Sequence, residues 1–232
     1  MILVTGATGN VGRHLVAQLL EQGLAVRALT RHPEKAQLPA GAEVVAGDLM
    51  DPAAVRSALE GVGAAFLFAV PGSAQGFLAA AREAGVRRIV FLSSGAVVDG
   101  VERQADLIAE MHAEIERAIE ASGLEWTFLR PSIFAANALQ WAWSIRASGS
   151  VSLPFPGSTG APIDEADIAA VAVQALTTDR WVGQKLMLTG PESLSQADQI
   201  AILGEVLGRP IPVVALDPAV AVQVFDDLLA RE

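Results

Sequence analysis

Three glycines near the start of the chain have the spacing of a phosphate-binding turn. Gly6, Gly9 and Gly12 follow the apolar run 1–4 and precede a segment whose apolar residues recur at helical spacing. Gly6 would allow a tight turn, Gly9 would let a pyrophosphate approach the backbone, and Gly12 would let the helix pack close to the strand. The N-terminus of that helix would add free N–H groups and a positive dipole end. A plain strand–turn–helix is the alternative, but the context favours a dinucleotide site.

The end of the second predicted strand, 24–30, indicates which nucleotide binds. No acidic residue stands there to accept a hydrogen bond from a ribose 2′-hydroxyl. Arg31 can instead pair with a 2′-phosphate, and Lys35 lies nearby, so the sequence favours NADP(H) over NAD(H). Asp48, after the third strand, is placed to accept a hydrogen bond from the adenine edge. The alternatives are a solvated arginine and an ordinary turn aspartate.

Apolar runs alternate with helical patterns along the first part of the chain. The predicted strands are 1–4, 24–30, 43–46, 64–70, 88–92 and 126–130, and the predicted helices 13–23, 52–59, 73–84 and 102–121. This alternation predicts an α/β fold, a Rossmann-type doubly wound parallel sheet. Ligands bind at the carboxyl ends of such strands. Those ends are Gly6, Arg31, Asp48, Val70, Ser94 and Pro131.

The pattern loosens after residue 131. We predict one NAD(P)-binding domain, 1–232, with 1–131 as its dinucleotide-binding core and 132–232 mainly a small C-terminal substrate lobe packed on it. The later elements are predicted as helices 134–147, 164–176, 193–207 and 218–230, strands 185–188 and 212–216, and a loop 154–162.

Aromatic residues on the predicted helix 134–147 suggest an acceptor pocket. Asn137 and Trp141 are four residues apart, so they are expected to share a helix face. With Phe134 and Trp143 they would give the pocket aromatic walls. Ordinary core packing of an aromatic helix face is the alternative.

Composition excludes several classes of function. The formal net charge is -10 and no basic stripe is visible, which argues against nucleic acid as a partner. The absence of cysteine rules out disulfides and thiolate ligands, and with three histidines we expect no metal site. No apolar run approaches the roughly 20 residues of a membrane span, and no leader pattern is seen. We expect a cytoplasmic monomer or homodimer that acts on a small-molecule substrate.

Further motifs add to the glycine turn and cover nearly the whole chain. They are Thr5–Gly12, Gly47–Leu49, Leu92–Ser94, His112 with Glu116, Ser122–Pro131, Phe134 with Asn137, Asp167–Ala169 and Leu188–Pro191. With this set the chain resembles the NmrA-like atypical branch of the short-chain dehydrogenases. That branch includes quinone oxidoreductases, triphenylmethane-dye reductases, imine reductases and redox-sensing regulators.

The strand ends and the resemblance together give the expected site. The expected cofactor-binding residues are Gly6, Thr8, Gly9, Asn10, Val11, Gly12, Arg31, Asp48, Leu49, Val70, Pro71, Ser93, His112 and Pro131. The expected substrate-binding residues are Ser94, Phe134, Asn137 and Trp141.

The chain departs from the family at the catalytic motif. The resemblance implies Tyr-x-x-x-Lys with a helper serine, and a glutamate four residues after the lysine. Anchored on Glu116, the lysine position holds His112 and the tyrosine position holds Ile108, and the chain contains no tyrosine. We therefore name His112 as the candidate catalytic residue, either protonating a quinone oxyanion or bonding the nicotinamide ribose. Protonation by water, and a histidine without a site role, are the alternatives.

Hydride transfer itself needs mainly positioning of the nicotinamide against an acceptor. The first hypothesis is therefore an NADPH-dependent oxidoreductase that passes hydride to a quinone-like or other conjugated small molecule. The second is a non-catalytic NAD(P)-binding redox sensor, and the third an imine or enone reductase of a biosynthetic pathway.

Overall fold

The computed structural model describes residues 1–217 and 219. Two compact units form within this part: the first comprises Met1–Ser132 and Ile163–Leu188, and the second comprises Ile133–Pro162 and the described residues from Thr189 onward. The predicted helix 218–230 lies outside the described residues, apart from residue 219. Among the helices that are described, none has both the length and the apolar character needed to cross a membrane.

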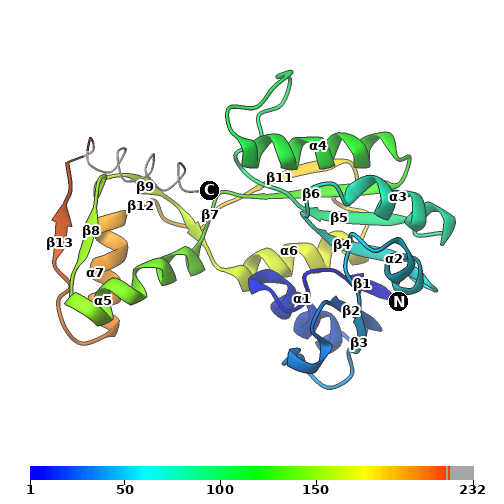
Figure 1. Cartoon of the computed structure of the whole chain (residues 1–232), viewed down its shortest axis with the longest axis horizontal. Helices are drawn as coiled ribbons and strands as arrows, with labels where there is room; N and C mark the ends of the chain where they lie inside the picture. Colours follow the sequence, from blue (N-terminus) through cyan, green and yellow to red (C-terminus); the bar gives the residue numbers. More distant parts are fainter. Residues whose placement is uncertain (218, 220–232) are drawn as a thin grey trace. The chain divides into compact units, whose positions relative to one another are not determined.

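The first unit is built on a seven-stranded sheet with the order β11-β6-β5-β4-β1-β2-β3 (Figure 1). Its strands are β1 (Ile2–Val4), β2 (Val26–Thr30), β3 (Glu43–Ala46), β4 (Ala64–Phe68), β5 (Arg88–Leu92), β6 (Glu125–Pro131) and β11 (Gln184–Leu188). Each neighbouring pair in this sheet is parallel; Leu3, for example, lies opposite both Arg27 and Ala65. The strand order reverses at β1, which defines a switch point between β1 and β4. The predicted Rossmann-type sheet is confirmed.

Helices cover both faces of this sheet, as Figure 1 shows. On one face, α1 (Asn10–Glu21) packs against α6 (Glu165–Thr177). On the other, α2 (Pro52–Leu59), α3 (Ala74–Glu83) and α4 (Leu107–Ala121) share an apolar core with alternate strand residues such as Leu3 and Phe91. Successive strand residues point to opposite faces, so near-continuous apolar strands satisfy both layers. A short 3-10 helix, η1 (Pro33–Lys35), follows β2.

Two features of the first unit differ from the sequence-based expectation. Helix α4 begins at Leu107 rather than at residue 102, because the Asp106 carboxylate caps the helix by accepting a bond from the Ala109 backbone N–H. Elements α6 and β11 belong to this unit, although we assigned them to the region 132–232. These elements belong to the first unit because α6 packs on α1 and β11 pairs with β6. The predicted boundary at residue 131 otherwise stays a prediction.

The second unit has small elements around its own core. They are β7 (Ile133–Phe134), the 3-10 helix η2 (Ala135–Trp141), α5 (Ala142–Ser148), β8 (Val151–Leu153), β9 (Thr159–Gly160), β12 (Leu194–Ser195), α7 (Gln196–Val206) and β13 (Val213–Ala215), with β10 (Pro162–Ile163) at its boundary. Strands β8 and β13 pair in parallel, and β9 and β12 antiparallel. The core contains Trp141, Ile145, Val151, Leu153, Ile200 and Ile211.

The predicted continuous helix 134–147 is wrong over its first half. Residues 135–141 form η2, which has three residues per turn. Asn137 and Trp141 therefore do not share a helix face. The predicted loop 154–162 is also partly wrong, since it contains β9 and the start of β10.

Candidate nucleotide-binding site

The glycine turn between β1 and α1 has the close approaches that its spacing predicts. Gly6 has φ +61°, a left-handed conformation that favours glycine, and a Cβ on it would lie 3.0 Å from the Cβ of Phe68. A Cβ on Gly12 would lie only 2.2 Å from the carbonyl oxygen of Gly6. Gly12 therefore lets the first turn of α1 lie directly against the end of β1.

The N-terminus of α1 has no side-chain cap, a feature that it shares with α3 and α5 (Ala142–Ser148) among the described α-helices. Gly9 is its N-cap residue, and no side chain caps it. By contrast, α2, α4, α6 and α7 carry side-chain caps from Asp51, Asp106, Asp164 and Ser195. An uncapped helix start directly after a glycine turn fits a pyrophosphate, because its N–H groups and dipole favour an anion. The predicted residues Thr8, Asn10 and Val11 lie in this turn and first helical residues.

Two polar residues that are not among the predicted cofactor-binding residues hold this turn in place. The buried Thr5 hydroxyl donates to the Phe66 carbonyl at 3.1 Å and accepts from the Phe68 N–H at 2.8 Å, which ties β1 to β4. The Arg13 guanidinium donates to the carbonyls of Gly9 and Thr8, both at 3.2 Å. An arginine one helical turn after Gly9 was the available sequence signal for the second contact.

The predicted nucleotide-selecting residues lie at the carboxyl ends of adjacent strands. Arg31 follows β2 and Asp48 follows β3, and the Gly47 N–H donates to the Thr30 carbonyl at 3.0 Å between them. The Arg31 side chain is exposed. Asp48 also accepts a bond from the Met50 N–H at 2.9 Å, which is typical of a turn aspartate. Contact of either residue with a nucleotide stays a prediction.

The remaining predicted cofactor residues also follow strand ends. Val70 and Pro71 come after β4, and the Ser73 hydroxyl donates to the Val70 carbonyl at 2.9 Å. Leu49 is half-buried and packs against the core. Pro131 ends β6 and is buried.

Ser93 and Ser94 follow β5, and each hydroxyl has a partner in the structure. The Ser93 hydroxyl donates to a carboxylate oxygen of Glu116 on α4 at 2.5 Å. The Ser94 hydroxyl accepts a bond at 3.2 Å from the backbone N–H two residues later. These bonds give both serines a structural role, and their predicted contacts with cofactor and substrate stay predictions.

His112 lies half-buried on α4, one turn before Glu116. Its Nδ1 is 2.7 Å from the carbonyl oxygen of Ile108, which assigns the N–H to Nδ1. In the neutral ring Nε2 then carries the lone pair, and in the charged ring Nε2 carries the second proton. The Ile108 side chain, 64% exposed, offers no hydroxyl in place of the family tyrosine.

A chain of ion pairs lies beside His112. Arg130, at the end of β6, is bonded to Glu116 and to Asp99, and Asp99 is also bonded to Lys185 of β11. Hydrogen bonds that Arg130 donates to Glu116 raise the pKa of Arg130, against the opposing effect of burial. Hydrogen bonds from Arg130 and Lys185 hold the pKa of Asp99 well below its usual value. Of these four residues, the sequence motifs named only Glu116 and Arg130.

The predicted substrate-binding residues divide between the two units. Ser94 lies in the first unit, whereas Phe134, Asn137 and Trp141 lie in the second. Trp141 is buried in the core of the second unit, which speaks against a role as a pocket wall. Trp143, by contrast, is 79% exposed. An acceptor pocket that combines these residues stays a prediction.

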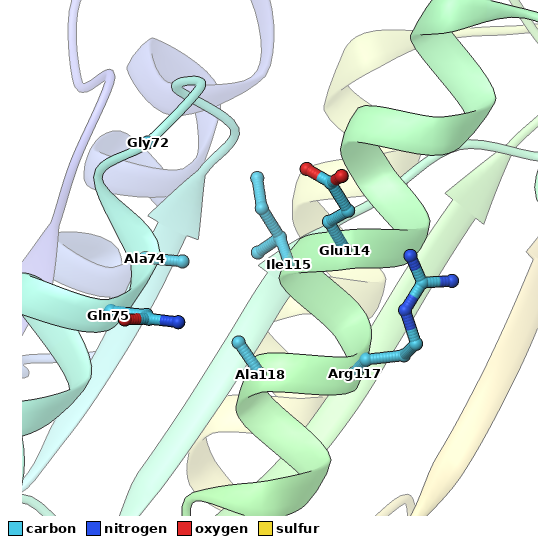
Figure 2. A pocket seen from close by; sticks show the side chains of 7 residues that line it. All are labelled: Gly72, Ala74, Gln75, Glu114, Ile115, Arg117 and Ala118. Carbon is cyan, nitrogen blue, oxygen red and sulfur yellow. The ribbon is translucent and has the colours of Figure 1, made fainter.

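A pocket of about 480 Å³ lies between α3 and α4 in the first unit (Figure 2). Ala74, Ile115 and Ala118 point into the space between the helices, and Arg117 points away from α3. Its lining residues are Gly72, Ala74, Gln75, Glu114, Ile115, Arg117 and Ala118, and none of the predicted site residues is among them.

The first unit thus has a parallel sheet, a glycine turn at the switch point and a free helix start. A family model described as NAD(P)H-binding matches residues 6–179, and the chain belongs to this family. It is 42% identical over 215 residues to (4-alkanoyl-5-oxo-2,5-dihydrofuran-3-yl)methyl phosphate reductase of Streptomyces griseus, covering 91% of this chain and 75% of that protein.

Two further relatives also bear names of reductases. The chain is 38% identical over 224 residues to NAD(P)H azoreductase of Xenophilus azovorans, covering 93% of this chain and 77% of that protein. The structure of the NADPH-dependent quinone oxidoreductase QOR2 from Escherichia coli, complexed with NADPH, matches with TM-score 0.79 at 27% identity, covering 94% of this chain and 80% of that one. The expected resemblance to NAD(P)H-dependent oxidoreductases of the atypical short-chain branch is confirmed.

Proposed function

We propose that the chain is an NADPH-dependent reductase that transfers hydride to a conjugated small-molecule acceptor, quinone-like or an enone, without a tyrosine proton donor. The observation that carries the proposal is a glycine turn shaped for a pyrophosphate in the same unit as His112, in a chain without tyrosine. The names of the three relatives support the acceptor class. An acyl furanone, an azo compound and a quinone each contain a conjugated double bond that takes up one hydride and one proton.

In this reaction, residues of the first unit would bind the cofactor and supply the proton. Bound NADPH would supply the hydride. The turn at Gly6, Gly9 and Gly12 would hold its pyrophosphate, and Arg31 its 2′-phosphate. The Ile108 carbonyl holds Nδ1–H of His112, so that Nε2 of the charged ring is left to give the acceptor its proton. The acceptor then gains two hydrogens, and His112 is reprotonated from solvent.

The test follows NADPH absorbance with purified protein and a panel of acceptors. The panel contains an acyl furanone, an azo dye, a naphthoquinone and a triphenylmethane dye, with NADH run in parallel. Oxidation with any one of these acceptors supports the proposal and identifies the class. Protein that binds NADPH but reduces none of them overturns it in favour of a redox sensor.

Arg31→Ala should lower the preference for NADPH. Loss of a charge-assisted pair with the 2′-phosphate is expected to raise the Kd for NADPH about 10- to 100-fold and leave the Kd for NADH within twofold. Fluorescence titration of both nucleotides measures this difference. Arg56→Ala, which removes an exposed arginine on α2, is the matched control and should change neither Kd. An unchanged NADPH affinity in the Arg31 variant would refute its role.

His112→Gln should separate acceptors that need a proton from one that does not. With a furanone or a quinone, kcat is expected to fall about 100-fold, because a positioned general acid is lost. A cationic triphenylmethane dye needs only hydride, so its kcat should stay within threefold of the wild type. Steady-state rates with saturating NADPH give both values. Equal losses with all acceptors would mean that His112 binds cofactor rather than supplies the proton.

A further inference from the structure

One guanidinium in the first unit holds two carboxylates from different parts of the chain. Arg130 is 6% exposed and bonds Glu116 through Nε at 2.9 Å and Nη2 at 2.6 Å. It bonds Asp99 through Nη1 and Nη2, both at 2.9 Å. Both contacts are two-point pairs, which fix orientation as well as distance. Arg130 therefore links the positions of two elements.

The first of these elements is α4, the helix that carries His112. Glu116 is buried and also accepts the bond from Ser93, so α4 is fixed to the ends of β5 and β6. His112 is one helical turn away on the same side, with its ring centroid 6.1 Å from that of Phe91 in β5. The Arg130–Glu116 pair thus fixes how close the His112 side of α4 lies to the ends of β5 and β6.

The second element is the segment 95–106, between β5 and α4. Asp99 ties this segment to Arg130 and, at 2.9 Å, to Lys185. The buried Gln104 amide closes the segment on itself through two bonds of 2.9 Å to the Val98 backbone. The backbone N–H of Gln104 donates to the Glu110 carboxylate of α4 at 2.7 Å. The segment is therefore a compact loop, and Asp99 holds it to the sheet.

Exposed apolar side chains belong to this loop and to the helix start that follows it. The loop starts at the carboxyl end of β5, the edge where ligands bind in such sheets. It carries the exposed Val98 and Val101 and leads directly into the exposed Leu107 and Ile108 at the start of α4. Exposed apolar residues that follow a ligand-binding strand end, one of them the Ile108 whose carbonyl bonds His112, fit a flat conjugated acceptor.

We propose that Asp99 is a positioning residue. Through its bonds to Arg130, Asp99 holds the segment 95–106 in the position where this segment contacts the conjugated acceptor next to His112. This proposal rests on the proposed function, because it assigns the segment 95–106 to the surface that contacts the acceptor. Asp99 itself touches no reacting atom. Its role predicts an effect on acceptor KM, with kcat and cofactor affinity preserved.

The test compares two variants that each remove one carboxylate from Lys185. Asp99→Asn also weakens the bond to Arg130, whereas Glu120→Gln removes only the 3.0 Å contact of Lys185 and serves as the matched control. Asp99→Asn is expected to raise the acceptor KM about tenfold, with kcat and NADPH Kd within twofold of wild type. Glu120→Gln should leave all three values unchanged.

A second measurement does not depend on turnover. Trypsin cleavage after the exposed Arg103 reports directly on the segment, and should be faster in Asp99→Asn than in wild type or Glu120→Gln. Unchanged cleavage, or faster cleavage with an unchanged acceptor KM, overturns the proposal. If the wild type reduces no acceptor, the proposed function fails by itself. The cleavage rates then still decide whether Asp99 holds the segment.

Discussion

Replacing Gly12 by alanine is expected to abolish NADPH binding and to lower the free energy of unfolding by about 1–3 kcal/mol. The new Cβ would lie 2.2 Å from the Gly6 oxygen, 2.8 Å from the Ala7 Cα and 2.9 Å from the Gly6 carbonyl carbon. All three atoms belong to the backbone, so no side-chain rotation relieves the overlap. The start of α1 must move away from the turn, which takes its N–H groups away from the pyrophosphate position.

Gly76→Ala is the matched control for this experiment. Gly76 lies within α3, and a Cβ there would meet nothing within 4 Å. This variant should bind NADPH like the wild type and gain up to about 1 kcal/mol, since alanine favours a helix. Fluorescence titration and urea unfolding measure both variants. Wild-type affinity in the Gly12 variant would show that the turn is not where the pyrophosphate binds.

Arg88→Ala should destabilise the protein by about 3–5 kcal/mol, the largest loss we expect from a residue remote from the glycine turn. The Arg88 side chain is 1% exposed at the start of β5. It donates to Glu125 at 2.7 and 3.0 Å, to Asp179, and to the carbonyls of Ala175 and Thr178. Its removal leaves a cavity and several acceptors without their donor.

The neighbouring residue offers the control. Arg87 is 64% exposed, and its ion pairs with Glu125 and Asp179 are 3.6 and 3.5 Å long. Arg87→Ala should therefore cost less than about 1 kcal/mol in urea unfolding. Equal losses in the two variants would contradict the structural role of Arg88. NADPH affinity of the folded protein should stay unchanged in both, because Arg88 lies at the opposite end of its strand from Ser93.

Acid should reduce the difference between the wild type and Arg88→Ala. The hydrogen bond from Arg88 lowers the pKa of Asp179 in the folded state. A lowered pKa stabilises the fold above the ordinary aspartate pKa of about 4, and this contribution is lost as the pH falls through the folded-state pKa. The urea midpoints of the wild type and of Arg88→Ala should therefore lie closer together at acidic pH than at neutral pH. A difference that does not change with pH would mean that packing alone explains the loss.

Local patterns were enough to predict much of the first unit. Strand β3 and helix α2 have the predicted ends, because an apolar run bounded by turns and an Asp51–Pro52 start are signals within a few residues. The start of α4 was predicted five residues too early. Residues 102–106 have a composition that suits a helix, but the Asp106 cap makes α4 begin at Leu107.

Contacts between distant residues could not be predicted from one sequence. Asp99 and Lys185 meet across 86 positions of the chain, so neither residue carries a local sign of the other. The core position of Trp141 likewise depends on Val151, Ile200 and Ile211, which gather only in the folded second unit. An aromatic residue on a short helix looks the same in the sequence whether it lines a pocket or a core.

The interrupted first unit has a consequence for synthesis on the ribosome. Strands β1 to β6 emerge in order, but β11 emerges only after residues 133–162 of the second unit have been made. Until then β6 is an edge strand with unpaired backbone groups, and the Thr127 hydroxyl lacks its acceptor, the Trp181 carbonyl. Such an edge can pair with other chains. The pace of translation through this stretch therefore sets how long the nascent protein is open to aggregation.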